Sequence, residues 1–333
     1  MDVLIILSGA PGNIIFSTPL IRCLKTRLEN PRISFLTSEE NKYLLQDNPY
    51  LDKVYDFSDF RKHRKQHSNR FTYVFDLDAD LRSRLVTAFI SGTVFRIQKR
   101  TWKKWLLTRL KINQMIPTHI ADQYLQTASR LNLSGDGLRP DFFIPYKDEV
   151  PTEWLPEPFR KGYIVFCISA QHATRRLPLS RMIEVCDRIN KPVVILGSSA
   201  DADDGAQLEK FFTRREEHAD LENTLLALNK KTVVYNGCGK FNFNQQASII
   251  KQSRYVFTFD NDFIAVASAF GKETFAMYGN TVLDFGSYPY HTRFTIFENN
   301  RLSCRPCSAK GYGKCPLKHF RCMNDLMFDF YVG

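Results

Sequence analysis

Short loops that follow predicted strands hold the residues best suited to chemistry. The first loop, SGAPGN, comes directly after the apolar run Val3–Leu7 and contains Gly9, Gly12 and Asn13. Glycines let the backbone turn sharply and approach a ligand closely. The spacing differs from G-x-G-x-x-G, so by itself this loop fits a plain strand-to-helix turn better than a dinucleotide site.

A second loop carries two adjacent arginines. It begins at Ser169, after a predicted strand, and Arg175 and Arg176 precede Pro178, a residue typical of the first turn of a helix. Two guanidinium groups beside a helix start could clamp a pyrophosphate. They could equally be solvated arginines of a surface loop.

Two further loops follow predicted strands in the second half of the chain. Asp260 ends one strand and Asp262 lies near the next helix start, where either carboxylate could cap the helix or, at a strand end, bind a ribose hydroxyl. Gly279 follows another strand. In α/β sheets such loops meet at the carboxyl edge, where ligands bind.

Half of the eight cysteines lie near the C-terminus, at positions 304, 307, 315 and 322. A C-x-x-C pair brings two thiolates to one ion, so Cys304 and Cys307 with Cys315 and Cys322 could complete a structural zinc site, with His319 as a substitute for Cys322. The alternative is four reduced thiols that bind nothing.

Strands alternate with helices along the whole chain, which predicts an α/β fold with parallel sheets and helices on both faces. The expected strands are 3–7, 32–37, 53–57, 73–77, 94–97, 163–169, 192–197, 232–235, 255–259 and 274–278. The expected helices are 14–28, 80–90, 119–132, 179–189, a stretch to about 229, 244–252 and 263–270. We expect two Rossmann-like domains facing a cleft: residues 1–150, a proline-rich linker at 151–162, residues 163–300, and a Cys-rich tail at 301–333.

Composition restricts the class of protein. The 333 residues are 44% hydrophobic and 24% charged, which is typical of globular domains. No apolar run reaches the roughly 18 residues of a membrane span, and the start MDVLIIL lacks the features of a signal peptide, so we expect a cytoplasmic protein. The net charge of +11 favours an anionic partner. We see no nucleic-acid recognition motif and expect no such partner.

The basic stretch KRTWKKWLLTRLK has two possible roles. Trp102 and Trp105 recur at near-helical spacing with Lys103 and Lys104 between them. Such an amphipathic helix could lie peripherally on the inner face of the cytoplasmic membrane. It could also pack its apolar stripe on the protein's own core, which is the commoner case.

Taken in order, these motifs resemble glycosyltransferase family 9, the ADP-heptose:lipopolysaccharide heptosyltransferases. GNIIFSTPLIRCLK is similar to the opening G-D-x-x-x-x-T-P-x-x-R-x-L-K, and RRLPLSRMIEV to K-R-W-P-x-E-R-F-x-x-L. TFDNDFIAVASAFGKETFAMYGNT resembles T-x-D-S-G-x-M-H-x-A-A-A-x-G-x-P-x-x-x-x-x-G-P-T. VVILGSSADADD and the Cys-rich tail also have counterparts in the family.

The resemblance implies a GT-B fold and inverting transfer from a nucleotide diphosphate sugar, without a catalytic cofactor. It places the acceptor on the N-terminal domain and the donor on the C-terminal one. It assigns catalysis to positions 13 and 175, here Asn13 and Arg175. It assigns the donor site to Gly12, Ser169, Arg175, Arg176, Gly197, Asp260, Asn261, Asp262, Gly279 and Thr281.

Several positions depart from the family pattern. The aspartate proposed as the family's general base is Asn13, and a carboxamide cannot take a proton near neutral pH. The motif lysine is Arg175, which keeps the charge. In the donor loop the glycine is Asp262 and the histidine is Ala265. A carboxylate at position 262 would oppose the binding of a diphosphate at the helix start.

Two functions therefore follow from the sequence. The first is a glycosyltransferase that moves a sugar, expected to be heptose, to a lipopolysaccharide-type, anionic saccharide or glycolipid acceptor. The second is a catalytically degenerate family member that acts as a binding or assembly protein at the membrane surface. Asn13, Asp262 and Ala265 favour the second; the retained Arg175, Arg176, Asp260 and Thr281 favour the first.

Overall fold

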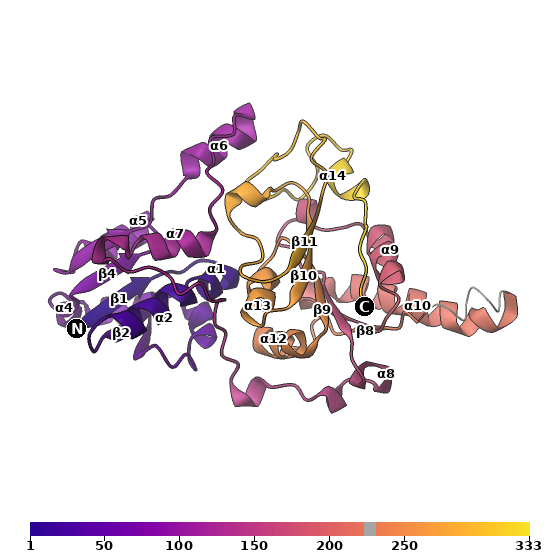
Figure 1. Ribbon diagram of the computed structural model, residues 1–333, viewed down its shortest axis with the longest axis horizontal. Coiled ribbons are helices and arrows are strands. Elements are labelled where there is room, and N and C mark those ends of the chain that lie inside the picture. Colours follow the sequence, from indigo (N-terminus) through magenta and orange to yellow (C-terminus); the bar gives the residue numbers. More distant parts are fainter. Residues whose placement is uncertain (223–230) are drawn as a thin grey trace.

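A computed structural model describes residues 1–222 and 231–333, without the side chains of Arg64 and 216–222. The chain forms two parallel sheets that lie side by side (Figure 1). The first has the order β3-β2-β1-β4-β5 and comprises β1 (Asp2–Ile6), β2 (Arg32–Thr37), β3 (Lys53–Asp56), β4 (Tyr73–Asp76) and β5 (Thr93–Arg96). Its strands run parallel, as the alternation of strands and helices predicts.

The second sheet has the order β11-β10-β9-β6-β7-β8 and is also parallel. Its strands are β6 (Ile164–Cys167), β7 (Val193–Leu196), β8 (Val234–Asn236), β9 (Tyr255–Phe259), β10 (Glu273–Tyr278) and β11 (Phe294–Glu298). The sequence analysis missed β11. This strand lies at the sheet edge and only Phe297 in it is fully buried, so its pattern of apolar residues is weak.

The prediction of a single helix over residues 14–28 is wrong in one respect. The segment forms two helices, α1 (Pro11–Phe16) and α2 (Thr18–Arg27). Pro19 has no N–H to donate to the preceding turn. The hydroxyls of Ser17 and Thr18 donate instead to the carbonyls of Ile14 and Ile15, each at 2.7 Å. The break fixes the direction of α1 behind the first loop.

The remaining helices of the first half cover its sheet and lead to the second. They are η1 (Glu39–Leu44), α3 (Phe57–Lys62), α4 (Arg64–His67), α5 (Leu81–Thr87), α6 (Thr101–Leu110), α7 (Ile120–Gln126) and η2 (Ser129–Leu131). Asp80 caps α5 through a capping box with Ser83, as expected for an aspartate before a helix. The segment expected as one helix at 119–132 consists of α7 and η2.

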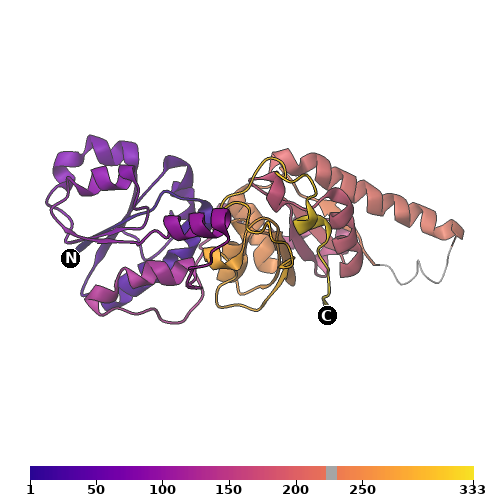
Figure 2. The same cartoon turned by 90° about the horizontal axis from the view of Figure 1, so that it is seen from above.

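The second half contains η3 (Tyr146–Asp148), η4 (Thr152–Trp154), α8 (Glu157–Arg160), η5 (Ala173–Arg175), α9 (Leu179–Ile189), η6 (Ser199–Asp201), α10 (Ala202–Glu222), α12 (Phe243–Gln252), α13 (Phe263–Ala269), η7 (Leu283–Phe285) and α14 (Arg321–Asn324). The expected helix to about residue 229 is confirmed as far as α10; residues 223–229 lie outside the described part. Helix α10 projects beyond the second sheet (Figure 2). Within residues 1–222 and 231–333 no helix is long and apolar enough to cross a membrane.

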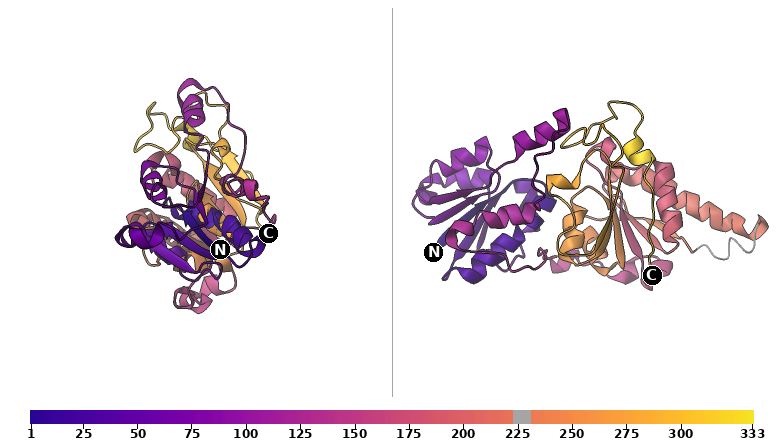
Figure 3. Two further views of the ribbon diagram at one scale, coloured as in Figure 1. Left: turned by 90° about the vertical axis from the view of Figure 1, so that its left-hand side faces the viewer. Right: turned by 45° about the horizontal axis from the view of Figure 1, so that its top comes forward.

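The two halves meet where α1 packs on α13. Buried side chains of both helices, such as Ile14 and Phe263, belong to one continuous apolar cluster. The C-terminal segment packs on the second sheet, where Met323, Leu326 and Phe328 are buried. It also approaches α6 (Figure 3), and Lys111, just after α6, donates to the carbonyls of Cys304 and Pro306 at 2.9 and 2.7 Å.

Candidate functional site

Three residues predicted for the donor site meet at the carboxyl ends of β9 and β10. Arg175 Nη1 donates to the carbonyl of Asp260 at 3.2 Å and lies 3.5 Å from its carboxylate Oδ2. Thr281 Oγ1 donates to the same Oδ2 at 2.6 Å. The three side chains come from the separate loops that follow β6, β9 and β10, so the second sheet must form before the cluster exists.

The Asp260 carboxylate is 8% exposed, and burial raises its pKa, while Arg175 and Thr281 act in the opposite direction. A second cation comes from the first half of the chain. Lys104 on α6 donates to the carbonyl of Phe285 at 3.3 Å and is near enough to act electrostatically on Asp260. Burial lowers the pKa of the Lys104 ammonium. The cluster is thus a cationic environment around one carboxylate.

The structure places the adjacent Arg176 in a different environment from Arg175. Arg176 Nη1 lies 2.9 Å from Asp201 Oδ1, and Nη2 lies 2.6 Å from Asp204 Oδ2. Ser169 Oγ donates to Asp201 at 2.6 Å. Gly197 passes close to Asp201 as well, since a side chain at Gly197 would come within 3.0 Å of its Cβ. The two arginines therefore do not form a pair, and Arg176 is already neutralised by two carboxylates.

Asn261, next to Asp260 in the sequence, connects the Asp260 loop to the loop of Ser169. Its Nδ2 donates to the carbonyl of Ser169 at 2.8 Å, and its Oδ1 accepts from Thr258 Oγ1 and from the N–H of Phe263. Asn261 is thus the side chain that accepts a backbone N–H at the start of α13. Asp262 is at the N-cap position but makes no capping bond, so the expectation that its carboxylate caps the helix is wrong.

Asp262 turns instead toward the first half of the chain. Its Oδ1 accepts the N–H of Gly12 at 2.8 Å, a contact that leaves no space for a side chain at Gly12. Burial raises the pKa of Asp262. On the other side of the same loop, Asp78 accepts both the N–H and the hydroxyl of Ser8 at 2.8 and 2.7 Å. Gly12 and Asn13 belong to the first turn of α1, which follows this loop.

Close packing at the end of β10 explains Gly279. A Cβ there would lie 2.6 Å from the carbonyl of Thr174. Arg305, which the sequence analysis did not select, is 8% exposed and donates to the carbonyls of Gly279 and Thr281 at 2.5 and 2.8 Å. The tail therefore supports the loop that carries Thr281. An arginine inside C-R-P-C is the only sequence signal for this role.

All eight cysteines are free thiols. In the tail, Cys304 Sγ lies 3.9 Å from His319 Nε2. Burial and the neighbouring thiols Cys304 and Cys315 raise the pKa of Cys307. Among the described residues, however, no three His, Cys, Asp or Glu side chains converge as metal ligands. The tail thiols are near one another without forming a complete site.

The tryptophans of α6 are exposed, Trp102 by 60% and Trp105 by 54%. Leu106 and Leu107 on the same helix are buried. Lys104, expected at the membrane, contacts Phe285 instead.

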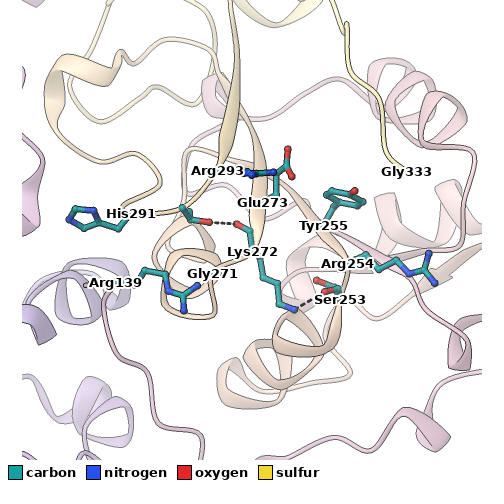
Figure 4. A pocket seen from close by; sticks show the side chains of 11 residues that line it. Arg139, Ser253, Arg254, Tyr255, Gly271, Lys272, Glu273, His291, Arg293 and Gly333 are labelled. Atoms are coloured by element: carbon teal, nitrogen blue, oxygen red, sulfur yellow. Dashed lines mark hydrogen bonds between the residues drawn. The ribbon is translucent and has the colours of Figure 1, made fainter. Parts of the chain in front are cut away.

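A separate pocket of about 730 Å³ opens beside Tyr255 and Glu273, the first residues of β9 and β10 (Figure 4). Arg139, Arg254, Lys272 and Arg293 line it, and Lys272 donates to the carbonyl of Ser253 at 2.8 Å. It lies at the amino ends of β9 and β10, so it is separate from the site described above.

Comparisons with known proteins agree with this architecture. The chain matches the sequence profile of glycosyltransferase family 9 (heptosyltransferase) over residues 60–318. No curated protein matches it. Among solved structures, a family 9 glycosyltransferase from Veillonella parvula has 17% identity and a TM-score of 0.66, with 89% of this chain and 85% of that chain covered.

Two further structures are similar. ADP-heptose lipopolysaccharide heptosyltransferase II of E. coli has 17% identity and a TM-score of 0.65, with 98% of both chains covered. The iron-containing dodecameric glycosyltransferase TibC of enterotoxigenic E. coli has 10% identity and a TM-score of 0.52, covering 97% of this chain and 71% of that one. The fold is of the GT-B type, and the chain belongs to glycosyltransferase family 9, the heptosyltransferase family.

Proposed function

We propose that this protein transfers heptose, with inversion, from an ADP-activated donor bound at the Arg175–Asp260–Thr281 cluster to a saccharide of the lipopolysaccharide type. The donor would lie against the second sheet and the acceptor against the first, with residues 1–150 and 163–300 as the two domains. ADP-heptose is the donor in the name of the E. coli relative. Arg175 would stabilise the diphosphate as it leaves, because a guanidinium binds two phosphate oxygens at once.

The cluster itself carries the proposal. Arg175 and Thr281 hold a buried carboxylate at the end of β9, in the position that the family resemblance assigns to the donor. A buried charge of this kind is retained at a cost unless it is paired, and here the partners are in place. The degenerate alternative does not explain why Arg175, Asp260 and Thr281 are retained together at the donor positions.

A basic pocket beside α6 suits an anionic acceptor. It has a volume of about 710 Å³ and lies after β5, at the carboxyl edge of the first sheet. Lys99, Arg100, Lys103 and Arg130 line it. Phosphorylated or acidic sugars would be attracted by these charges.

We also propose that α6 contacts the membrane surface from which a glycolipid acceptor would be drawn. Exposed Trp102 and Trp105 next to Lys103 and Arg109 combine interfacial aromatic residues with positive charge. The test is sedimentation with vesicles of anionic lipid. Trp102→Ala/Trp105→Ala should reduce the bound fraction, and equal binding of both proteins would contradict the contact.

For the tail we propose a structural metal ion held by Cys304, Cys307, Cys315 and Cys322, with zinc as the expected ion. TibC, a relative of similar fold, is iron-containing. The four thiols lie near enough to act electrostatically on one another, which supports a shared ion. Elemental analysis of the purified protein should find about one metal ion per chain, and metal-free folded protein would refute the site.

The donor proposal is tested by calorimetry with ADP-heptose, ADP and the sugar conjugates of UDP, GDP and CMP. One nucleotide sugar should bind. Arg175→Ala should weaken its binding about 10- to 100-fold, the loss expected for one charge-assisted contact of about 1.5–3 kcal/mol. Arg293→Ala, in the separate pocket at the amino ends of β9 and β10, is the matched control and should bind normally. Absence of binding across the panel would overturn the proposal.

A further inference from the structure

Sugar transfer needs a group that removes the proton of the acceptor hydroxyl, and position 13 cannot supply it because Asn13 has no basic oxygen near neutral pH. The structure brings three carboxylates to the junction of the two halves: Asp78, Asp260 and Asp262. Their contacts differ, and the differences show which one remains available.

Asp260 is committed to the donor cluster. Its Oδ2 accepts from Thr281 and faces Arg175, and the side chain is almost fully buried. The ion pair with Arg175 favours the charged form of this carboxylate and opposes its protonation. It is a poor candidate for a base that must meet a second substrate.

Asp78 is directed to Ser8 and is removed from the donor cluster. One oxygen, Oδ2, receives both the N–H and the hydroxyl of Ser8. The charges that act on it are those of Asp76 and Asp80 on its own strand end and helix start. Both of its hydrogen bonds therefore stay within the first half of the chain.

Asp262 has a carboxylate oxygen without a hydrogen-bond donor among the described residues, and it also lies beside the donor cluster. Its Oδ1 is held by Gly12 N–H, and among residues 1–222 and 231–333 no donor bonds to Oδ2. The side chain is partly exposed, and Arg175 and Asp260 both act on it electrostatically. It therefore adjoins the donor cluster on one side and the loop of Asn13, in the first half, on the other.

We infer that Asp262 is the general base of this protein, in a reaction that rests on the proposed function. Asp262 Oδ2 takes the proton of the acceptor hydroxyl while that oxygen forms a bond to the anomeric carbon. The bond from the anomeric carbon to the diphosphate oxygen breaks, and the nucleoside diphosphate leaves with the electron pair.

Two observations support this assignment independently of the elimination above. The carboxylate that is absent at position 13 is present on the facing residue of the other half, directly hydrogen-bonded to Gly12, the neighbour of Asn13. Burial also raises the pKa of Asp262, which makes a carboxylate a stronger base. The facing ionisable groups are Asp260, Arg175 and Tyr43, whose pKa burial raises to about 12.

The test measures ADP release from ADP-heptose with water as acceptor, so that the identity of the natural acceptor does not matter. Asp262→Asn keeps an oxygen for the Gly12 N–H and removes the base. Its rate should fall about 10²- to 10⁴-fold, while the calorimetric Kd for ADP-heptose should not rise, because the variant removes a negative charge near the diphosphate. The wild-type rate of ADP release should fall as the pH drops below the pKa of Asp262. The rate of Asp262→Asn should not show this fall.

A rescue separates catalysis from a structural role. Asn13→Asp/Asp262→Asn returns a carboxylate to the same junction and should recover at least about tenfold over Asp262→Asn, a fraction of what a general base contributes. Three results would each overturn the assignment. They are ADP release by Asp262→Asn at the wild-type rate, a loss of ADP-heptose binding in Asp262→Asn as large as the loss of rate, and a loss of rate in Asp78→Asn but not in Asp262→Asn. Binding without any release in the wild type would do the same. Absence of ADP-heptose binding would refute the proposed function itself, which distinguishes the two failures.

Discussion

At the scale of single residues, the candidate site is defined by which charged side chains are already paired within the protein. Arg175 and Arg176 are neighbours in the sequence, but only Arg175 reaches Asp260, because Arg176 is paired with Asp201 and Asp204. Motif position could predict that these residues lie near a ligand. It could not predict their partners, since pairing depends on loops brought together from three parts of the chain.

The Thr281 hydroxyl is predicted to stabilise the fold through Asp260. Thr281→Val removes the 2.6 Å hydrogen bond to a buried carboxylate and should cost about 1–3 kcal/mol in the free energy of unfolding. Thr281→Ser keeps the hydroxyl and is the control, with a loss of about 1 kcal/mol or less from the missing methyl group. Urea denaturation measures both; equal losses in the two variants would mean that the hydrogen bond contributes nothing.

At the scale of elements, hydrophobic periodicity predicted every strand except β11, because buried parallel strands are continuous apolar runs. It predicted most of the longer helices but not the short helices α3, α4, α8 and α14. The break between α1 and α2 at Ser17 was missed although Pro19 signals it. The contact of Gly12 with Asp262 could not be predicted from either element alone. It depends on how α1 packs on α13, which involves residues 250 positions apart.

Helix α3 offers a test of capping. Asp56 accepts from the N–H and hydroxyl of Ser58 and from the N–H of Asp59, and these bonds together with Lys42 hold its pKa far below the usual range. Asp56→Ala should cost about 1–2 kcal/mol at neutral pH. Asp56→Asn retains an acceptor and should cost less.

The pH dependence of this cap has a definite sign. A lowered pKa in the folded state stabilises the fold above the unfolded value of about 4, and this stabilisation is lost as the pH falls toward the folded value. The difference in unfolding free energy between wild type and Asp56→Ala should therefore shrink below about pH 4. A difference independent of pH between 2 and 6 would contradict the role of the charge.

At the scale of the whole molecule, the two halves are joined by contacts that sequence alone did not suggest. Besides α1 on α13, His119 at the start of α7 packs its ring on Tyr290 at 4.3 Å, and its Nε2 bonds to the carbonyl of Tyr288 at 2.8 Å. Its other nitrogen, Nδ1, accepts the N–H of Ala121. A neutral imidazole is required for this pattern, since a protonated ring has no acceptor.

Burial lowers the pKa of His119 to about 4. In the unfolded chain the pKa of this histidine is about 6.5. Between about pH 6.5 and 4 the unfolded chain therefore binds more protons than the folded one. The free energy of unfolding should fall as the pH drops from about 6.5 to about 4, by on the order of 3 kcal/mol in total. His119→Asn keeps a capping acceptor and cannot be protonated. Its unfolding free energy should change less between pH 7 and 4.5 than that of the wild type; parallel curves would exclude His119 as the cause.

The central claim is that the chain is a working heptosyltransferase despite Asn13. The most direct measurement is mass spectrometry of lipopolysaccharide cores, truncated at successive sugars, after incubation with ADP-heptose and the protein. We predict that one core gains a single heptose in the presence of the wild type and gains none with Asp260→Ala. Unmodified cores throughout, under conditions in which ADP-heptose binds, would contradict the claim and favour a binding or assembly protein.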